Sequence, residues 1–337
     1  MPQITFLEVT PVERAYLKKS PLAKYKSNLL EEKAQDVDPA IFRKAEVLSV
    51  FIYSQLTAAF IAKVPQLRLI ATRSTGYDHI DLAACKKRKI AVATVPFYGE
   101  NTVAEHAFAL ILALSRKVHQ AYFRTIHGDF SFEGLQGFDL RGKTLGIIGT
   151  GHIGLHAIRM AKGFSMRVIA SDVNKNNFMA ETLGFEYVPF DQLLAQSDII
   201  SLHAPYNKHT HHLINKTNIP KIKRGALLIN TARGGLVETE ALALALDQGI
   251  LSGAGLDVLE GEELIKEERQ ILSHEFSIDR LKTLLQNHIL LNRENVVITP
   301  HIGFNSKEAF MRILDTTVTN IQGFLEGKPE NLVVPMK

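Results

Sequence analysis

Four strand-like stretches of this chain end in side chains that transfer protons or hold anions. His203 ends the run DIISLH, Arg233 follows ALLINTA, and His301 follows VVITP. Two acids, Asp257 and Glu262, lie in GLDVLEGE. Arginine binds carboxylates through paired donors, and histidines and carboxylates are the commonest proton carriers in enzymes. Because ligands of open α/β sheets bind beyond the carboxyl ends of the strands, we expect these side chains to converge at one crevice.

A glycine-rich turn in the middle of the chain is suited to binding phosphate. The stretch LGIIGTGHIG contains three glycines in the spacing G-x-G-x-x-G, namely Gly149, Gly151 and Gly154. A strand is expected at 145–149 and a helix at 152–163, and this context makes the pattern informative. The first glycine permits a tight turn, the second a close approach of pyrophosphate, and the third close packing of helix on strand. Free N–H groups at the helix start then face the phosphates.

An acidic residue follows at the distance that a dinucleotide-binding turn requires. Asp172 comes after the strand-like run RVIAS, about 20 residues beyond the glycines. A carboxylate there can accept both ribose hydroxyls of the adenosine and would repel a 2′-phosphate. We therefore expect NAD (NADH) as the cofactor rather than NADP, although Lys175 lies close enough in sequence to weaken that preference.

The elements that position these groups form two series of alternating strands and helices. Strands of the first series are expected at 3–9, 47–53, 67–73 and 90–95, with helices at 57–64 and 80–89. Strands of the second are expected at 145–149, 167–171, 198–202, 226–230, 253–258 and 296–299, with helices at 152–163 and 238–248. Long apolar-periodic helices are expected at 101–118 and 306–328. Such alternation predicts parallel sheets covered by helices.

Composition excludes several classes of protein. The chain has 337 residues, 46% hydrophobic and 22% charged, which is ordinary for a globular protein with room for two domains. The net charge is +4 with scattered basic residues, so no nucleic-acid partner is expected. The single cysteine, Cys85, provides neither an internal disulfide nor a metal-binding cluster. With no signal sequence or bilayer-length apolar run, we predict a cytoplasmic protein without membrane contact or metal.

Five motifs follow one another along the second series: GIIGTGHIG, SLHAP, NTARGGLV, GLDVLEGE and TPHIGF. The sequence and order of these motifs resemble those of the D-isomer-specific 2-hydroxyacid dehydrogenases. The stretches STGYDHIDL, YGENTVAEHAF and FSFEGLQGFDLRGKT are most similar to the NAD-dependent D-lactate dehydrogenase branch of that family. The resemblance implies reduction of a small 2-oxo acid by NADH, with pyruvate expected first. Glyoxylate, hydroxypyruvate and branched 2-oxo acids remain alternatives, as does an NAD-sensing regulatory role.

The same resemblance implies roles for the catalytic residues. Arg233 would hold the substrate carboxylate with a bidentate fork that lysine lacks. His301 would protonate the oxo oxygen as hydride arrives at the neighbouring carbon. Glu262 would hydrogen-bond the other ring nitrogen and favour the protonated ring. Its neighbours Glu260 and Glu263 remain alternatives for that acid.

Binding positions also carry over by resemblance. The cofactor-binding set is Gly149, Gly151, His152, Ile153, Gly154, Asp172, His203, Ala204, Pro205, Thr210, Thr231, Ala232, Arg233 and Asp257. The substrate-binding set is Ser74, Thr75, Gly76, Tyr98, Arg233 and Phe304. Asp257 is expected to bind the carboxamide, and the 74–76 backbone to grip the substrate carboxylate. Phe51, Tyr98 and Phe304 suggest an apolar wall, although Tyr98 packing beneath the loop is an alternative.

The family's topology implies a split chain. Residues 1–100 and 301–337 would form a flavodoxin-like α/β substrate-binding domain. Residues 101–300 would form the inserted NAD-binding domain, a Rossmann-type doubly wound parallel sheet. The apolar face of the 101–118 helix is a candidate homodimer surface, but a helix buried inside its own domain would give the same pattern.

Overall fold

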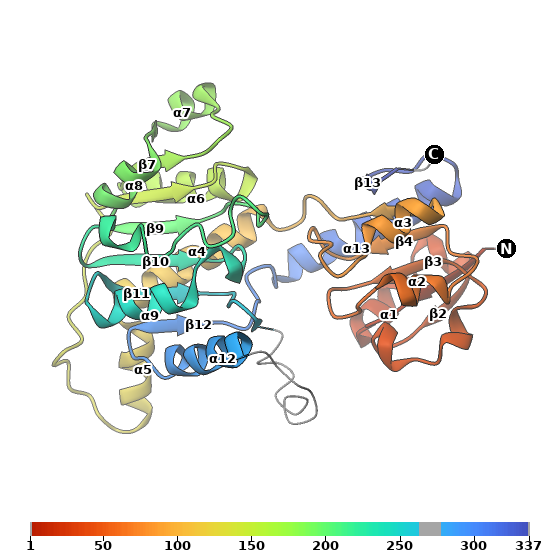
Figure 1. Cartoon of the computed structure of the whole chain (residues 1–337), viewed down its shortest axis with the longest axis horizontal. Helices are drawn as coiled ribbons and strands as arrows, with labels where there is room; N and C mark the ends of the chain where they lie inside the picture. Colours follow the sequence, from red (N-terminus) through yellow and green to blue (C-terminus); the bar gives the residue numbers. More distant parts are fainter. Residues whose placement is uncertain (1, 263–277, 336–337) are drawn as a thin grey trace. The chain divides into compact units, whose positions relative to one another are not determined.

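The chain folds into two compact units (Figure 1). The computed structural model describes residues 2–262 and 278–335. Unit 1 comprises Met1–Tyr98 and Ser306–Lys337, and unit 2 comprises Gly99–Asn305. The chain therefore builds most of unit 1, then all of unit 2, and returns to unit 1 at its end.

Unit 1 contains, within the described residues, a six-stranded sheet in the order β13-β5-β4-β3-β1-β2. Its strands are β1 (Gln3–Phe6), β2 (Lys26–Leu29), β3 (Ala45–Val50), β4 (Leu69–Thr72), β5 (Ala91–Ala93) and β13 (Leu332–Val334). All neighbours are parallel except β13, which runs antiparallel to β5. Without β13 the order is that of flavodoxin-like sheets.

Helices cover this sheet, and caps set where they begin. The α-helices of unit 1 are α1 (Pro11–Leu17), α2 (Ala58–Ala62), α3 (Leu82–Arg88) and α13 (Lys307–Leu325). Short 3-10 turns lie at η1 (Pro21–Lys24), η2 (Ala34–Asp36) and η3 (Pro39–Phe42). Thr10 and Glu13 form a capping box at α1, and Asp81 caps α3. All residues of β4 are buried, as expected for a parallel strand covered on both faces.

Unit 2 contains a seven-stranded parallel sheet among the described residues, in the order β12-β11-β10-β9-β6-β7-β8. Its strands are β6 (Thr144–Ile148), β7 (Arg167–Ser171), β8 (Glu186–Tyr187), β9 (Ile199–Leu202), β10 (Ala226–Asn230), β11 (Leu251–Leu256) and β12 (Val296–Ile298). The order reverses between β6 and β9, which is the switch point where doubly wound sheets bind dinucleotides.

The helices of unit 2 follow its strands in alternation. They are α4 (Glu100–Ser115), α5 (Val118–Ile126), α6 (His152–Gly163), α7 (Asn177–Leu183), α8 (Phe190–Gln196), α9 (Thr239–Asp247) and α12 (Ile278–Leu291). Short 3-10 turns occur at η4 (Ile219–Lys221) and η5 (Gly234–Leu236). The predicted strands 167–171 and 226–230 and the helix 152–163 have the bounds of β7, β10 and α6. The strand β2, which is short and largely exposed, was not predicted because it carries little apolar periodicity.

One expectation that the structure corrects concerns the apolar face of the 101–118 helix. Ala104, Phe108, Ile111 and Leu114 of α4 are buried in the core of unit 2, together with apolar residues of β6 and α6. This face is therefore an internal packing surface and is not available to a second chain. The alternative interpretation of the same periodicity, a helix buried inside its own domain, is the one observed.

The junctions between units also differ from the predicted domain boundaries. The second junction lies at 305/306 rather than 300/301, so His301 and Phe304 belong to unit 2. The physical reason is Asp257, which accepts hydrogen bonds from the N–H groups of Ile302 and Gly303. These bonds keep the segment after β12 attached to the end of β11.

Candidate active site

The glycine turn between β6 and α6 has the shape of a phosphate site. Gly149 has φ +95°, and a Cβ there would lie 2.7 Å from the backbone nitrogen of Ala204. A Cβ on Gly154 would lie 2.1 Å from the carbonyl oxygen of Gly149. By contrast, a Cβ on Gly151 would meet nothing within 4 Å, and no side chain caps the α6 N-terminus that follows it. The turn thus leaves backbone donors accessible beside open space, which fits a pyrophosphate.

Asp172 lies at the carboxyl end of β7 and is fixed by that same turn. Its Oδ2 accepts hydrogen bonds from the N–H (2.6 Å) and Oγ1 (3.0 Å) of Thr150, and its Oδ1 accepts one from Asn174 N (2.8 Å). Thr150 Oγ1 also lies 2.8 Å from the Tyr187 hydroxyl. Sequence reasoning missed Thr150 and Tyr187. The carboxylate is partly exposed and is held in place beside the glycine turn.

The loop after β9 carries four of the predicted cofactor positions. His203 Nε2 lies 2.9 Å from Ser201 Oγ, and burial lowers the pKa of His203 to about 4. The imidazole is therefore neutral near pH 7 and is not a proton donor there. Thr210 Oγ1 donates to Pro205 O (2.7 Å), so this hydroxyl braces the loop. Ala204 lies against Gly149, beside the phosphate turn.

Beyond β10 the chain turns through Thr231 and Ala232 to Arg233. Asn230 fixes this turn, since its Oδ1 accepts from Ala232 N and its Nδ2 donates to Arg233 O. Thr231 Oγ1 is buried without a hydrogen-bond partner among the described residues. A buried hydroxyl without a protein partner at a strand end is a group that a bound ligand can satisfy. At Gly234 a Cβ would lie 2.1 Å from the Leu259 carbonyl, so the loops after β10 and β11 touch.

Asp257, at the end of β11, holds the segment that carries His301. Its carboxylate accepts from Thr299 Oγ1 (2.5 Å), Ile302 N (2.9 Å) and Gly303 N (2.8 Å). His106 Nε2 of α4 lies 3.3 Å from Asp257 Oδ1. Burial by itself raises the pKa of Asp257, but the hydrogen bonds outweigh it and hold that pKa below the usual value. The Asp257 carboxylate therefore holds the segment after β12, which carries His301, at the end of β11.

His301 and Glu262 form a direct pair. Glu262 Oε1 lies 2.7 Å from His301 Nδ1, and both side chains are about one quarter exposed. His301 has a left-handed backbone, φ +57°, and its N–H donates to Asp257 O. The alternative acid Glu260 instead contacts His212 (2.5 Å) and Thr239. The other alternative, Glu263, lies outside the described residues.

In unit 1 the predicted anion-binding loop follows β4. Ser74 Oγ donates to Gly76 O (2.6 Å) and lies 2.7 Å from Thr72 Oγ1, while Thr75 Oγ1 donates to Val95 O (2.7 Å). Both side chains thus hold the loop. Within the described residues, the backbone N–H groups of Thr75 and Gly76 donate no hydrogen bond.

The two predicted aromatic positions lie in different units. Tyr98 is half-buried in unit 1, and its carbonyl accepts from Arg312 Nε of α13 (2.6 Å). Phe304 is half-buried in unit 2, three residues after His301. Sequence reasoning missed His106 and Thr299, which fix Asp257; their only signal was their position within the motifs YGENTVAEHAF and TPHIGF.

Among the described residues, no group of three or more His, Cys, Asp or Glu side chains is placed to hold a metal ion. No helix in residues 2–262 and 278–335 is both long and apolar enough to cross a bilayer.

Comparison with known proteins gives the family. Residues 108–303 match the NAD binding domain of the D-isomer specific 2-hydroxyacid dehydrogenases. This protein belongs to that family. The D-lactate dehydrogenase of Escherichia coli is 37% identical over 272 residues, 79% of each chain. The glyoxylate reductase of Korarchaeum cryptofilum is 35% identical over 296 residues, 86% of this chain and 83% of the relative.

A solved structure of a related dehydrogenase has the same fold. The D-lactate dehydrogenase of Aquifex aeolicus, complexed with NAD and lactic acid, superposes with a TM-score of 0.89. It is 37% identical, and the match covers 99% of this chain and 100% of that one. The predicted α/β fold, the NAD cofactor and the assignment as an NAD-dependent D-2-hydroxyacid dehydrogenase are confirmed. The glycine turn and the orphaned Thr231 hydroxyl described above fit that cofactor.

Proposed function

We propose that this 2-hydroxyacid dehydrogenase reduces pyruvate to D-lactate with NADH. The observation that carries the proposal is the Glu262–His301 pair, which follows β11 and β12 in a unit with an NAD-binding turn. Arg233 follows β10, the neighbour of β11, so all three side chains come from adjacent strand ends. A guanidinium, an imidazole and its carboxylate partner are what a 2-oxo acid needs for binding and protonation.

The chain's own residues have separable tasks. Arg233 binds the substrate carboxylate with its planar fork and orients the oxo group. His301 donates a proton from Nε2 to the oxo oxygen, because Nδ1 faces Glu262. Glu262 holds the ring through Nδ1 and so keeps Nε2 directed at the substrate. When bound, NADH supplies the hydride. In the reverse direction His301 accepts the proton from the hydroxyl of D-lactate.

We assign the 74–76 loop of unit 1 to the substrate. The N–H groups of Thr75 and Gly76 would bind the carboxylate, while Ser74 holds the loop in shape. Phe51 and Tyr98 of unit 1 would form an apolar pocket wall, and Phe304 stays a predicted substrate-binding residue of unit 2. Such a pocket admits a methyl group, but one methylene changes binding by only about 1–3 kcal/mol. Pyruvate is the proposed substrate, and glyoxylate, hydroxypyruvate and branched 2-oxo acids are the competing ones. The intact Arg233, Glu262 and His301 favour catalysis over a purely NAD-sensing role.

The experiment that tests this function is a substrate panel. Purified protein is mixed with NADH and each of several 2-oxo acids, and NADH absorbance is followed. We expect the highest kcat/KM with pyruvate and, in reverse, oxidation of D-lactate but not L-lactate. Inactivity on the whole panel, together with measurable NADH binding, would favour the sensing role.

We further propose that the protein is a cytoplasmic homodimer. The α5 helix presents four apolar side chains that are more than half exposed: Val118, Tyr122, Phe123 and Ile126. They share one helix face, and exposed apolar clusters of this kind are typical of interaction sites. Sedimentation should give a dimer for the wild type and a monomer for Phe123→Ser with Tyr122→Ser. The double variant Lys175→Ser with Lys208→Ser, at exposed sites elsewhere on unit 2, is the control.

A further inference from the structure

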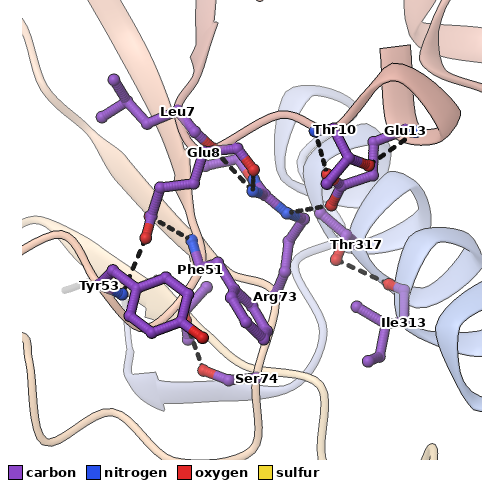
Figure 2. Close-up of polar contacts among 12 residues, drawn as sticks. Leu7, Glu8, Thr10, Glu13, Phe51, Tyr53, Arg73, Ser74, Ile313 and Thr317 are labelled. Carbon is purple, nitrogen blue, oxygen red and sulfur yellow. Dashed lines mark hydrogen bonds and ion pairs between the residues drawn. The ribbon is translucent and has the colours of Figure 1, made fainter. Parts of the chain in front are cut away.

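A buried arginine links three adjacent strand ends of unit 1 (Figure 2). Arg73 follows β4 and is 1% exposed. Its Nη2 donates to the carbonyl oxygens of Leu7 (2.7 Å) and Glu8 (3.0 Å) beyond β1, and its Nη1 donates to Ser49 Oγ of β3 (3.2 Å). Its own N–H donates to Val50 O (2.7 Å). One side chain therefore spans β4, β3 and β1, which are consecutive in the sheet.

The charge of Arg73 is balanced from inside the fold. Its Nε lies 3.0 Å from Oε1 of Glu13, whose side chain is 7% exposed. Burial lowers the pKa of Arg73, while the negative charges of Glu13 and Glu8 raise it. Glu13 is fixed by the α1 capping box with Thr10, so the ion pair has a rigid anchor. Removing one partner would leave an uncompensated buried charge, which is strongly destabilising.

Glu8 connects the Arg73–Glu13 ion pair to the loop that follows β3. It has a left-handed backbone (φ +56°), and both the Leu7 and Glu8 carbonyls accept from the guanidinium. Its partly exposed carboxylate accepts from Phe51 N, Tyr53 N and Ser54 Oγ, each at 2.8 Å. The backbone of Glu8 is thus held by Arg73, and its side chain holds the loop after β3 (Figure 2).

We propose that Glu8 and Arg73 are positioning residues that set the substrate selectivity of this dehydrogenase. Arg73 immediately precedes the 74–76 loop, and Glu8 clamps the loop that carries Phe51. Together they fix the spacing between the carboxylate-binding backbone and the apolar pocket wall. Neither residue touches the substrate in this assignment. The proposal rests on the proposed function, because it assumes that these two loops bind the 2-oxo acid.

The first test is Glu8→Gln, compared with Glu31→Gln. An amide keeps the size of Glu8 but offers one acceptor oxygen where the carboxylate has two, so at least one loop contact is lost. We expect KM for pyruvate to rise about tenfold. We also expect the kcat/KM ratio of pyruvate to 4-methyl-2-oxopentanoate to change about fivefold, while the NADH dissociation constant is unchanged. Glu31, exposed and paired with Arg14, is the control and should match wild type in every measurement.

The outcomes separate positioning from general support of the fold. A selective change in KM and substrate ratio, with NADH binding and melting temperature retained, supports the proposal. Parallel losses in kcat, NADH affinity and melting temperature would overturn it, as would kinetics equal to Glu31→Gln. Arg73→Lys is the second variant; it keeps the charge beside Glu13 but lacks the fork, and it should change KM in the same direction. Wild-type inactivity on every 2-oxo acid would refute the proposed function before any variant is compared.

Discussion

Oε1 of Glu262 lies 2.7 Å from Nδ1 of His301, while its neighbour Glu260 contacts His212. The carboxylate holds the His301 ring through Nδ1, and the proposed reduction needs that orientation because Nε2 must face the oxo oxygen. In Glu262→Gln the ring is held less firmly, so kcat/KM for pyruvate should fall about tenfold. NADH affinity should stay as in wild type. The measurements are kcat/KM for pyruvate and a fluorescence titration with NADH.

Glu260→Gln is the matched control for that experiment. It weakens the contacts to His212 and Thr239, so we expect the free energy of unfolding to fall by about 1–3 kcal/mol. The kcat/KM for pyruvate should stay as in wild type. A loss of kcat/KM in Glu260→Gln without one in Glu262→Gln would transfer the role of histidine partner to Glu260.

Arg233→Lys tests the carboxylate fork. Lysine supplies a point charge without parallel donors, so kcat/KM for pyruvate should fall about 100-fold or more. NADH affinity, from fluorescence titration, should change little. Arg224→Lys is the control, because Arg224 is exposed and donates a hydrogen bond to Gln248 O. Equal losses in both variants would remove Arg233 from substrate binding.

Asp172→Ala tests the choice between NADH and NADPH. Loss of the carboxylate removes the ribose acceptor and frees Thr150, so NADH affinity should fall about tenfold. NADPH should lose less, because repulsion of its 2′-phosphate also disappears. Dissociation constants for both cofactors are compared with those of Asp191→Ala, an exposed partner of Lys221. An unaltered ratio would show that Asp172 does not select the cofactor.

Gly154→Ala tests the packing of α6 on its strand. The added Cβ would lie 2.1 Å from Gly149 O, and overpacking of this kind costs about 1–3 kcal/mol. We expect a lower melting temperature and weaker NADH binding. Gly163→Ala lies in the same helix with nothing within 4 Å of its Cβ. It should keep or raise the melting temperature, and a fall equal to that of Gly154→Ala would contradict the steric explanation.

Because of His203, we expect the free energy of unfolding to decrease in acid. Burial lowers its pKa from 6.5 to about 4 in the folded chain. Between these values the unfolded chain binds more protons, so stability rises with pH across this window and is lost as pH falls through it. In His203→Asn, the decrease in the free energy of unfolding on acidification should be smaller by up to about 3 kcal/mol. Urea unfolding at several pH values measures it, and His209→Asn, at an exposed site, should keep the wild-type slope.

Local patterns were sufficient to predict the fold class and the cofactor. The strands 167–171 and 226–230 and the helix 152–163 were found with their predicted bounds because apolar periodicity and turns determine them locally. Gly149 and Gly154 were identified for the same reason, since their requirements arise within one strand–turn–helix unit. The dinucleotide-binding turn followed from this local unit, whereas the dehydrogenase family followed from the resemblance carried by five motifs along the second series.

Tertiary structure decided which of several similar residues face one another. The sequence places Glu260 and Glu262 two residues apart, and only the turn at Gly261 (φ +67°) and the packing after β11 send them to His212 and His301. The same holds for α4, whose periodicity is compatible with either an interface or an internal helix. The Glu8–Arg73 contact joins residues distant in sequence, which no local pattern encodes, because strand order in the sheet brings them together.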